Sequence, residues 1–363
     1  MTTEAAHGPG STARSGPVRG RGILEIPGIR LGHAGELTDS RLTGITAVLP
    51  PPGSTVGVDV RGGGPATRET DVIAPGTHSY GADAIVLTGG SAFGLGAVSG
   101  VVDTLAEAGL GFHAPGLADA VIPLVPAAAI FDLGRGDGSV APPTPAEGSQ
   151  AARAALSGET VEVRGSIGAG AGARSGFQSL RGGLGSCAVR LPGGITVAAV
   201  VVANSLGTIG TPSGGLWLDP LLRSFGLDLP KVQGLPATPP ADSGTGAKNT
   251  TIAIVATDAR LDPAQTTRMA SGAHAGISRA VQPSHTLFDG DTIFGIATGA
   301  NELTSGHDAA TRELVMVTAA AADALSLAIL DAHASATPVD GAWGQPPTLS
   351  EIAPDFASAF TAL

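Results

Sequence analysis

Two apolar runs near the middle of the sequence constrain the fold more than any other feature. The run at 195–203 (ITVAAVVVA) is rich in valine, and the run at 250–257 (TTIAIVAT) is equally rich in β-branched residues. The Val-rich first run is typical of a strand at the centre of a sheet, and the second run predicts a strand from its β-branched residues. We therefore expect a layered α/β protein.

Local signals predict the elements around these strands. The segment 84–88 (AIVLT) predicts a buried strand, and two glycines connect it to a helix over 91–108 with Ser91 as its N-cap. Asp262 and Pro263 form an N-cap and N1 pair, which predicts a helix that continues to about residue 281. A further strand is expected over 292–298.

The composition shows how such a core must be packed. Aromatic residues make up only 3% of the 363 residues, so small aliphatic side chains must fill the core and bring sheets and helices close together. We expect a flexible tail over 1–22 and one domain over 23–363. Segments 134–160 and 230–247 are rich in glycine and proline and are expected to be exposed and irregular. The apolar stretch 314–332 predicts a buried helix and not a membrane span.

Charge and residue usage exclude several classes of function. The net charge is −11 and lysine and arginine form no cluster, which argues against a nucleic-acid partner or an anionic membrane surface. The N-terminus has no apolar signal segment and Cys187 is the only cysteine, so we expect a cytoplasmic protein. The eight histidines lack metal-ligand spacing and no Walker-type loop is present, so no metal and no cofactor is expected.

The junction between Asn249 and Thr250 suggests chemistry. An irregular segment runs directly into a strand whose first residue carries a hydroxyl. That hydroxyl could attack the Asn249 carbonyl, and hydrolysis of the resulting ester would free an α-amine able to act as a base near neutral pH. The structural alternative is that threonine opens many strands because β-branched residues fit the pleat.

Four further residues could complete such a site. Asp289 and Asp291 could hold the amine and hydroxyl of Thr250, although Asp-Gly is also a common turn. Asn204 could donate its side-chain amide to an oxyanion, and Arg181 could place positive charge near it. A turn asparagine and a solvated arginine are the structural alternatives.

Taken together, these pieces resemble peptidase family S58, the group of D-aminopeptidase/esterase and β-aminopeptidase enzymes. The resemblance covers about residues 26–332, and threonine preceded by asparagine is closest to the branch that includes nylon-oligomer hydrolase. Six stretches carry it, at 84–102 (AIVLTGGSAFGLGAVSGVV), 125–133 (VPAAAIFDL), 181–185 (RGGLG), 201–207 (VVANSLG), 249–258 (NTTIAIVATD) and 283–292 (PSHTLFDGDT).

The resemblance implies an α/β fold, a four-layer αββα sandwich of the autoprocessed N-terminal-nucleophile type, with two antiparallel sheets between helical layers. It implies cleavage into an α fragment, 1–249, and a β fragment, 250–363, which stay together and assemble into a homo-oligomer of αβ heterodimers.

The implied activity is that of a self-cleaving aminopeptidase or amidase acting on small amino-acyl or peptide substrates. By the resemblance, the nucleophile is Thr250, the oxyanion donor Asn204, the acidic pair Asp289 and Asp291, and the basic group Arg181. The family more often has serine as nucleophile and lysine at the basic position. An acyltransferase of the ornithine acetyltransferase type, or a binding protein on the same scaffold, are the alternatives.

Overall fold

The secondary structure alternates short strands with helices along the chain. The computed structural model describes residues 17–79, 81–116, 120–159, 164–235, 249–339 and 344–363. The strands are β1 (Pro17–Val18), β2 (Arg30–Leu37), β3 (Leu42–Leu49), β4 (Thr55–Val60), β5 (Thr67–Arg68), β6 (Ile85–Thr88), β7 (Phe112–His113), β8 (Val121–Ile122), β9 (Ala127–Ala129), β10 (Arg174–Ser175), β11 (Leu180–Arg181), β12 (Gly183–Arg190), β13 (Thr196–Asn204), β14 (Thr250–Ala259) and β15 (Thr292–Asn301). The helices are α1 (Ser91–Gly94), α2 (Val98–Glu107), α3 (Pro145–Ser157), α4 (Asp219–Ser224), α5 (Pro263–Ala280), α6 (His307–Ala334), α7 (Leu349–Ile352) and α8 (Pro354–Thr361).

Two larger sheets organise the molecule. One has six strands in the order β1-β12-β13-β14-β15-β4, and the other has five in the order β2-β3-β6-β9-β5. The expectation of two antiparallel sheets is wrong at two places, because β14 pairs with β15 and β6 pairs with β9 in parallel. In both cases helices lie between the two strands in the chain, and parallel neighbours require such a crossover.

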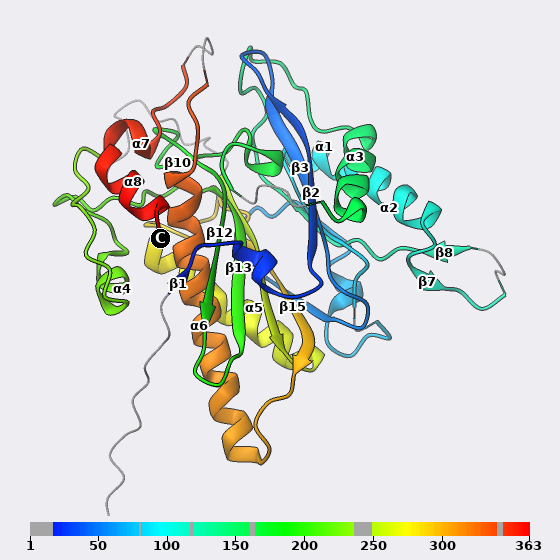
Figure 1. Cartoon of the computed structure of the whole chain (residues 1–363). Helices are drawn as coiled ribbons and strands as arrows, with labels where there is room; N and C mark the ends of the chain where they lie inside the picture. The colour runs from blue at the N-terminus through cyan, green and yellow to red at the C-terminus, as the bar shows by residue number, and fades with distance from the viewer. Residues whose placement is uncertain (1–16, 80, 117–119, 160–163, 236–248, 340–343) are drawn as a thin grey trace, which may run out of the picture.

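The sheets and helices form four layers, as predicted. Helices α5 and α6 cover the six-stranded sheet, while α2 and α3 pack near the five-stranded sheet on the other side of the molecule (Figure 1). One apolar cluster fills the space between the two sheets, and two others lie between each sheet and its helices. The fold is therefore an αββα sandwich.

Strand β14 shows how the sequence builds these layers. Ile252, Ile254 and Ala256 point into the core between the sheets, whereas Ala253 and Val255 point toward the helices. Successive side chains of a strand face opposite sides, so a run that is apolar at every position fits only a strand covered on both faces. This confirms the strand predicted over 250–257 and shows that both of its faces are buried.

Small residues let the helices approach the sheet closely. A Cβ atom at Gly185 in β12 would lie 2.1 Å from the carbonyl oxygen of Ala328 in α6, so only glycine fits there. By length and hydropathy α6 alone, among the helices of the described chain, could cross a membrane, but 67% of its apolar stretch is buried inside the protein. It is the buried helix expected from the sequence.

The tail expected over 1–22 is not irregular throughout. Residues 17 and 18 form β1, which pairs with β12, and the Arg19 guanidinium contacts the buried Asp331 carboxylate at 2.5 Å. The first residues of the fold therefore precede the expected boundary, and residues 1–16 of that tail lie outside the described residues.

Part of the segment expected to be irregular over 134–160 is also a helix. Thr144 caps α3, accepting a hydrogen bond from the Glu147 backbone while the Glu147 side chain returns one to the backbone of Thr144. This reciprocal cap, with proline at N1, overrides the helix-breaking composition of the neighbouring residues.

Buried His333 predicts acid sensitivity. Burial lowers its pKa to about 4, against an ordinary value of 6.5, and its ring contacts the Ile329 carbonyl at 2.8 Å. Between pH 6.5 and 4 the His333 ring is protonated in the unfolded chain and neutral in the folded chain. The free energy of unfolding therefore falls as the pH falls, by roughly 3 kcal/mol over the whole range. We expect the melting temperature of His333→Asn to change less with pH between these values than that of the wild type. His113→Asn, a change at an exposed histidine, should keep the pH dependence of the wild type. A His333→Asn curve parallel to that of the wild type would contradict this.

Candidate active site

The junction lies where three strands of the six-stranded sheet meet. Thr250 is the first residue of β14 and stands opposite Asn204, the last residue of β13. Asn249 forms a bridge to Asp289, just before β15. The Thr250 side chain is 5% exposed and Asn204 is fully buried. Strand pairing thus brings together residues that are 46 and 39 positions from Thr250 in the chain (250 − 204 and 289 − 250).

The carbonyl of Asn249 is held between two hydrogen-bond donors. The Thr250 hydroxyl donates to the Asn249 carbonyl oxygen over 2.5 Å, and the backbone N–H of Gly290 donates to the same oxygen over 3.2 Å. A Cβ at Gly290 would lie 3.0 Å from the Thr250 Oγ1 atom, so glycine permits this close approach. An N–H on a carbonyl oxygen is placed to stabilise negative charge that develops there.

The Asn204 side chain has a fixed orientation and a spare donor. Its Oδ1 accepts hydrogen bonds from the Arg135 Nη1 atom at 2.7 Å and from the Arg174 backbone N–H at 3.1 Å. Its Nδ2 has no partner among the described residues. A buried N–H without a partner is costly, so this amide is suited to a group that arrives from outside.

The two predicted carboxylates accept hydrogen bonds from the backbone next to Thr250 and from the loop before β15. Asp291 accepts from the Thr251 N–H at 2.7 Å and from the His285 ring at 2.7 Å. Asp289 accepts from the backbone N–H and the hydroxyl of Thr286 at 2.8 and 2.6 Å. In the described, uncut chain neither carboxylate bonds to the Thr250 hydroxyl, which differs from the expected contact.

Burial and charge shift the ionisation of this group. Burial raises the pKa of Asp289, and the neighbouring Asp291 charge adds to the increase. Burial alone would lower the pKa of His285, but the hydrogen bond to Asp291 and the charge of that carboxylate outweigh it, so the pKa is raised. The His285 and Asp291 pair therefore carries opposite charges over a wider pH range than an isolated histidine would permit.

Arg181 is fully buried away from the junction. Its Nη2 donates to the Ala171 carbonyl at 2.9 Å and to the Ser166 hydroxyl at 3.2 Å. Burial, together with the charge of Arg174, lowers its pKa to about 10, so it stays positive at neutral pH. Within the described residues it makes no hydrogen bond to Thr250 or Asn204. Its catalytic role stays a prediction.

Sequence reasoning missed Arg135, Gln178 and the Gly290 N–H. Arg135 lies in a glycine-rich stretch that was expected to be a surface segment, and Gln178 follows a glycine loop with no recognisable motif. No local pattern marks these residues, because their contacts are made with strands far away in the sequence.

A cavity of about 340 Å³ opens beside Thr250. Among the described residues, the polar side chains in its wall are those of Ser91, Asn249 and Thr250, and Ser91 has a left-handed backbone with φ of 53°. Left-handed non-glycine residues are strained and cluster at functional sites. The remaining wall is apolar or glycine: Gly64, Pro65, Ala66, Ala92, Ala129, Phe131, Leu287 and Phe288.

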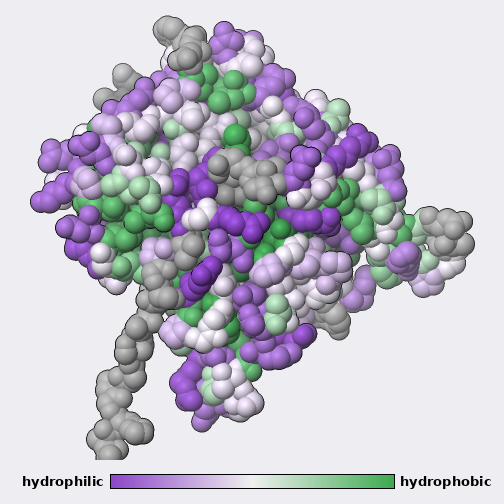
Figure 2. Space-filling view, in the orientation of Figure 1, coloured by the Kyte–Doolittle hydropathy of each residue, from purple (hydrophilic) through white to green (hydrophobic). Residues whose placement is uncertain are grey.

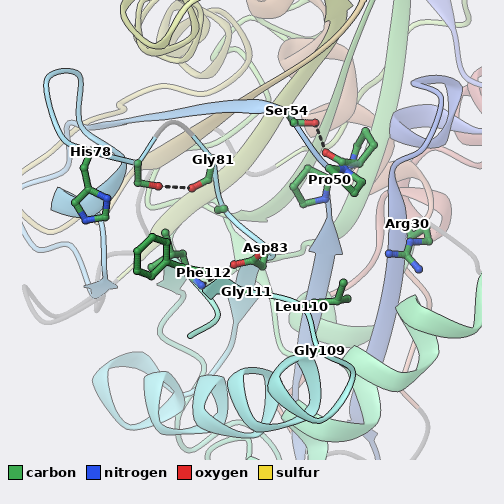
Figure 3. Close-up of a pocket in the computed structure, with 16 residues that line it drawn as sticks. Arg30, Pro50, Ser54, His78, Gly81, Asp83, Gly109, Leu110, Gly111 and Phe112 are labelled. Carbon is green, nitrogen blue, oxygen red and sulfur yellow. Dashed lines mark hydrogen bonds between the residues drawn. The ribbon is translucent and has the colours of Figure 1, made fainter. Parts of the chain in front are cut away.

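A second cavity, of about 620 Å³, contains none of the predicted site residues (Figure 3). Two of its polar side chains bond to its own wall: Asp83 accepts from the Leu124 N–H at 2.8 Å, and the Ser54 hydroxyl donates to the Pro51 carbonyl at 2.7 Å. The cavity beside Thr250 is therefore the better candidate for a reaction site.

The profile of peptidase family S58 matches residues 22–346. The chain belongs to this family. An aminopeptidase of Mycobacterium leprae described as uncharacterized is 42% identical over 337 residues, which cover 88% of this chain and 91% of that protein. A 6-aminohexanoate-oligomer endohydrolase of Paenarthrobacter ureafaciens is 32% identical over 317 residues, covering 82% and 81%. The family member described here is thus a hydrolase of the peptidase class, and its resemblance to the nylon-oligomer hydrolase branch is confirmed.

Solved structures show the same fold for this S58 peptidase. A β-aminopeptidase of Burkholderia sp. superposes with a TM-score of 0.67 at 23% identity, covering 95% of both chains. The L-aminopeptidase D-Ala-esterase/amidase of Ochrobactrum anthropi, described as a variant of the Ntn hydrolase fold, superposes with a TM-score of 0.64 at 22% identity, covering 88% of both.

Proposed function

We propose that this S58 peptidase cuts its own chain between Asn249 and Thr250 and then hydrolyses amide bonds with Thr250 as an N-terminal nucleophile. The observation that carries the proposal is the contact at the junction. The Thr250 hydroxyl lies 2.5 Å from the Asn249 carbonyl oxygen, and the Gly290 N–H lies on the same oxygen.

The first reaction is an acyl shift within the chain. The Thr250 Oγ1 attacks the Asn249 carbonyl carbon, and negative charge develops on the oxygen that already accepts from Gly290. The C–N bond then breaks, and the hydroxyl proton ends on the Thr250 nitrogen. Water cleaves the ester that results, leaving a carboxylate on Asn249 and a free α-amine on Thr250.

The second reaction uses the new amine. An α-amine has an ordinary pKa near 7.7–8, so it can take the proton of its own hydroxyl at neutral pH. The hydroxyl attacks a substrate carbonyl, the Asn204 Nδ2 donates to the oxyanion, and the leaving amine departs with a proton. Water then releases the acid from the acyl-enzyme and restores Thr250.

The apolar wall of the cavity beside Thr250 favours substrates with an uncharged acyl group. Leu287 and Phe288 are exposed large apolar residues at its edge, and its lining carries no carboxylate or cation among the described residues. Apolar walls gain free energy by removing apolar substrate surface from water. We propose small apolar amino-acyl amides as substrates.

We also propose that the protein is a cytoplasmic homo-oligomer of cleaved αβ heterodimers. The hairpin of β7 and β8 extends from the body of the molecule (Figures 1 and 2), and we assign its exposed apolar residues Phe112 and Ile122 to the contacts between subunits.

The test is to identify the ends of the mature protein and its products. We expect N-terminal sequencing and mass spectrometry to find a fragment that begins at Thr250, and native mass measurement to find several copies of the pair.

In a panel of amino-acyl p-nitroanilides, leucyl and alanyl derivatives should react at least about tenfold faster than aspartyl or lysyl ones, since burying an unpaired charge is costly. Release of free acid without an amine acceptor identifies hydrolysis, whereas a strict need for an acceptor would favour acyl transfer. An uncut chain after long incubation, without turnover, would disprove the proposal.

A further inference from the structure

The guanidinium of Arg135 contacts both sides of the candidate site. Its Nη1 donates to the Asn204 Oδ1 at 2.7 Å and also to the Gly172 carbonyl, and its Nη2 donates to the Gln178 Oε1 at 3.0 Å. The Gln178 Nε2 in turn donates to the side-chain oxygen of Asn249. One buried cation therefore connects the candidate oxyanion donor with the residue on the acyl side of the candidate cleavage bond.

The loop after β9 and the turn at Gln178 fix the positions of Arg135 and Gln178. The backbone N–H of Arg135 donates to the Asp132 carbonyl, and the Asp132 carboxylate accepts from the Gly90 N–H at 2.6 Å, so the loop after β9 is tied to the start of α1. Phe177 and Gln178 have φ of 56° and 70°. A left-handed conformation is strained for a non-glycine residue, so the fold holds the Gln178 turn against a local preference.

The positive charge of Arg135 strengthens the side-chain amide of Asn204 as a hydrogen-bond donor. Burial lowers the pKa of Arg135 to about 9, although the Asp132 charge opposes the shift, so the side chain is positive at neutral pH. A hydrogen bond from a cation to an amide oxygen draws electron density from the amide nitrogen. The Nδ2–H of Asn204, which has no partner among the described residues, becomes a stronger donor and keeps one orientation.

We propose that Arg135 is a positioning residue with two arms. One arm orients and polarises the Asn204 amide, which serves turnover of substrate. The other arm, through Gln178, holds the Asn249 side chain and serves self-cleavage, because Asn249 is on the acyl side of that bond alone. The inference rests on the proposed function and gives Arg135 a role distinct from that expected of Arg181.

The two arms can be separated with full-length variants. Self-cleavage would be followed on gels as a first-order process, and kcat and KM would be measured on the processed protein with an amino-acyl p-nitroanilide. We expect Arg135→Gln to slow self-cleavage and to lower kcat, each by about 10–100-fold, with KM within about threefold, because an oxyanion donor acts mainly in the transition state. Gln178→Leu should slow self-cleavage about tenfold and lower kcat by clearly less. Arg135→Lys, which keeps the charge but not the planar fork, should fall between wild type and Arg135→Gln in both rates.

Arg164→Gln is the matched control. Arg164 is also a largely buried arginine, but it pairs with Asp331 at 3.0 Å, away from the junction, and its loss should leave both rates unchanged. A folded Arg135→Gln protein that is cut about 10–100-fold more slowly than wild type, while Arg164→Gln is cut at the wild-type rate, supports the inference. Wild-type rates in Arg135→Gln, or equal losses in both arginine variants, would overturn it. If wild type itself is never cut, the proposed function fails instead, which is a different result.

Discussion

Replacing Thr250 with alanine is expected to leave a single uncut chain of 363 residues without activity on amino-acyl amides. The alanine variant lacks the only hydroxyl that contacts the Asn249 carbonyl oxygen among the described residues, so neither the acyl shift nor the later attack on substrate has a nucleophile. Gel electrophoresis and mass spectrometry after long incubation measure the first loss, and the p-nitroanilide assay measures the second. We expect no fragment and at least about a 10³-fold loss of activity.

Thr251→Val is the control for this variant. Thr251 is the next residue of β14, is also buried, and has an Oγ1 without a hydrogen-bond partner in the described part of the chain. Valine has nearly the same shape, so this protein should be cut. Thr250→Ser, which keeps a hydroxyl, should also be cut. Normal cleavage in Thr250→Ala would refute the mechanism, whatever the other two variants do.

Replacing Asn204 with alanine is expected to reduce turnover strongly while affecting self-cleavage less. The oxygen of the candidate cleavage bond accepts from Gly290, whereas the Asn204 Nδ2 has no hydrogen-bond partner among the residues that the structure describes. Loss of one oxyanion donor lowers kcat by about 10²–10³-fold in enzymes that use one. We expect a loss of this size in kcat with KM within about threefold.

The exposed Asn301 at the end of β15 provides a matched change from asparagine to alanine and should keep wild-type kinetics. If Asn204→Ala raises KM and leaves kcat intact, Asn204 binds the substrate in its ground state and is no oxyanion donor. If it blocks self-cleavage completely with the fold intact, the division of labour between Gly290 and Asn204 is wrong.

Local chemistry explains what the sequence could predict. The β-branched runs identified β13 and β14, and the Asp262 and Pro263 pair identified the start of α5, because both signals depend on neighbouring residues only. Of the two exceptions, the first has a local cause and the second a tertiary one. A capping box at Thr144 made a helix where glycine and proline suggested a loop, and helical crossovers made two strand pairs parallel.

The candidate site is harder to predict because its contacts are long-range. Asp289 and Asp291 were chosen with the help of a family resemblance, and their bonds to Thr286, His285 and Thr251 could not be seen in their spacing. Arg181 and Arg135 look alike in sequence, each beside glycine in a polar stretch. Their surroundings differ only after the loops have packed against β13.

The amino-acid order alone determined that a buried strand begins with a hydroxyl-bearing residue after asparagine, since strand propensity and apolar patterning are properties of neighbouring residues. Tertiary structure alone decided which donors reach the Asn249 carbonyl and the Asn204 amide. Gly290 and Arg135 reach them because strand pairing and loop packing join segments 41 and 69 residues apart, and hydrogen bonds depend on ångström-scale placement that no local pattern encodes.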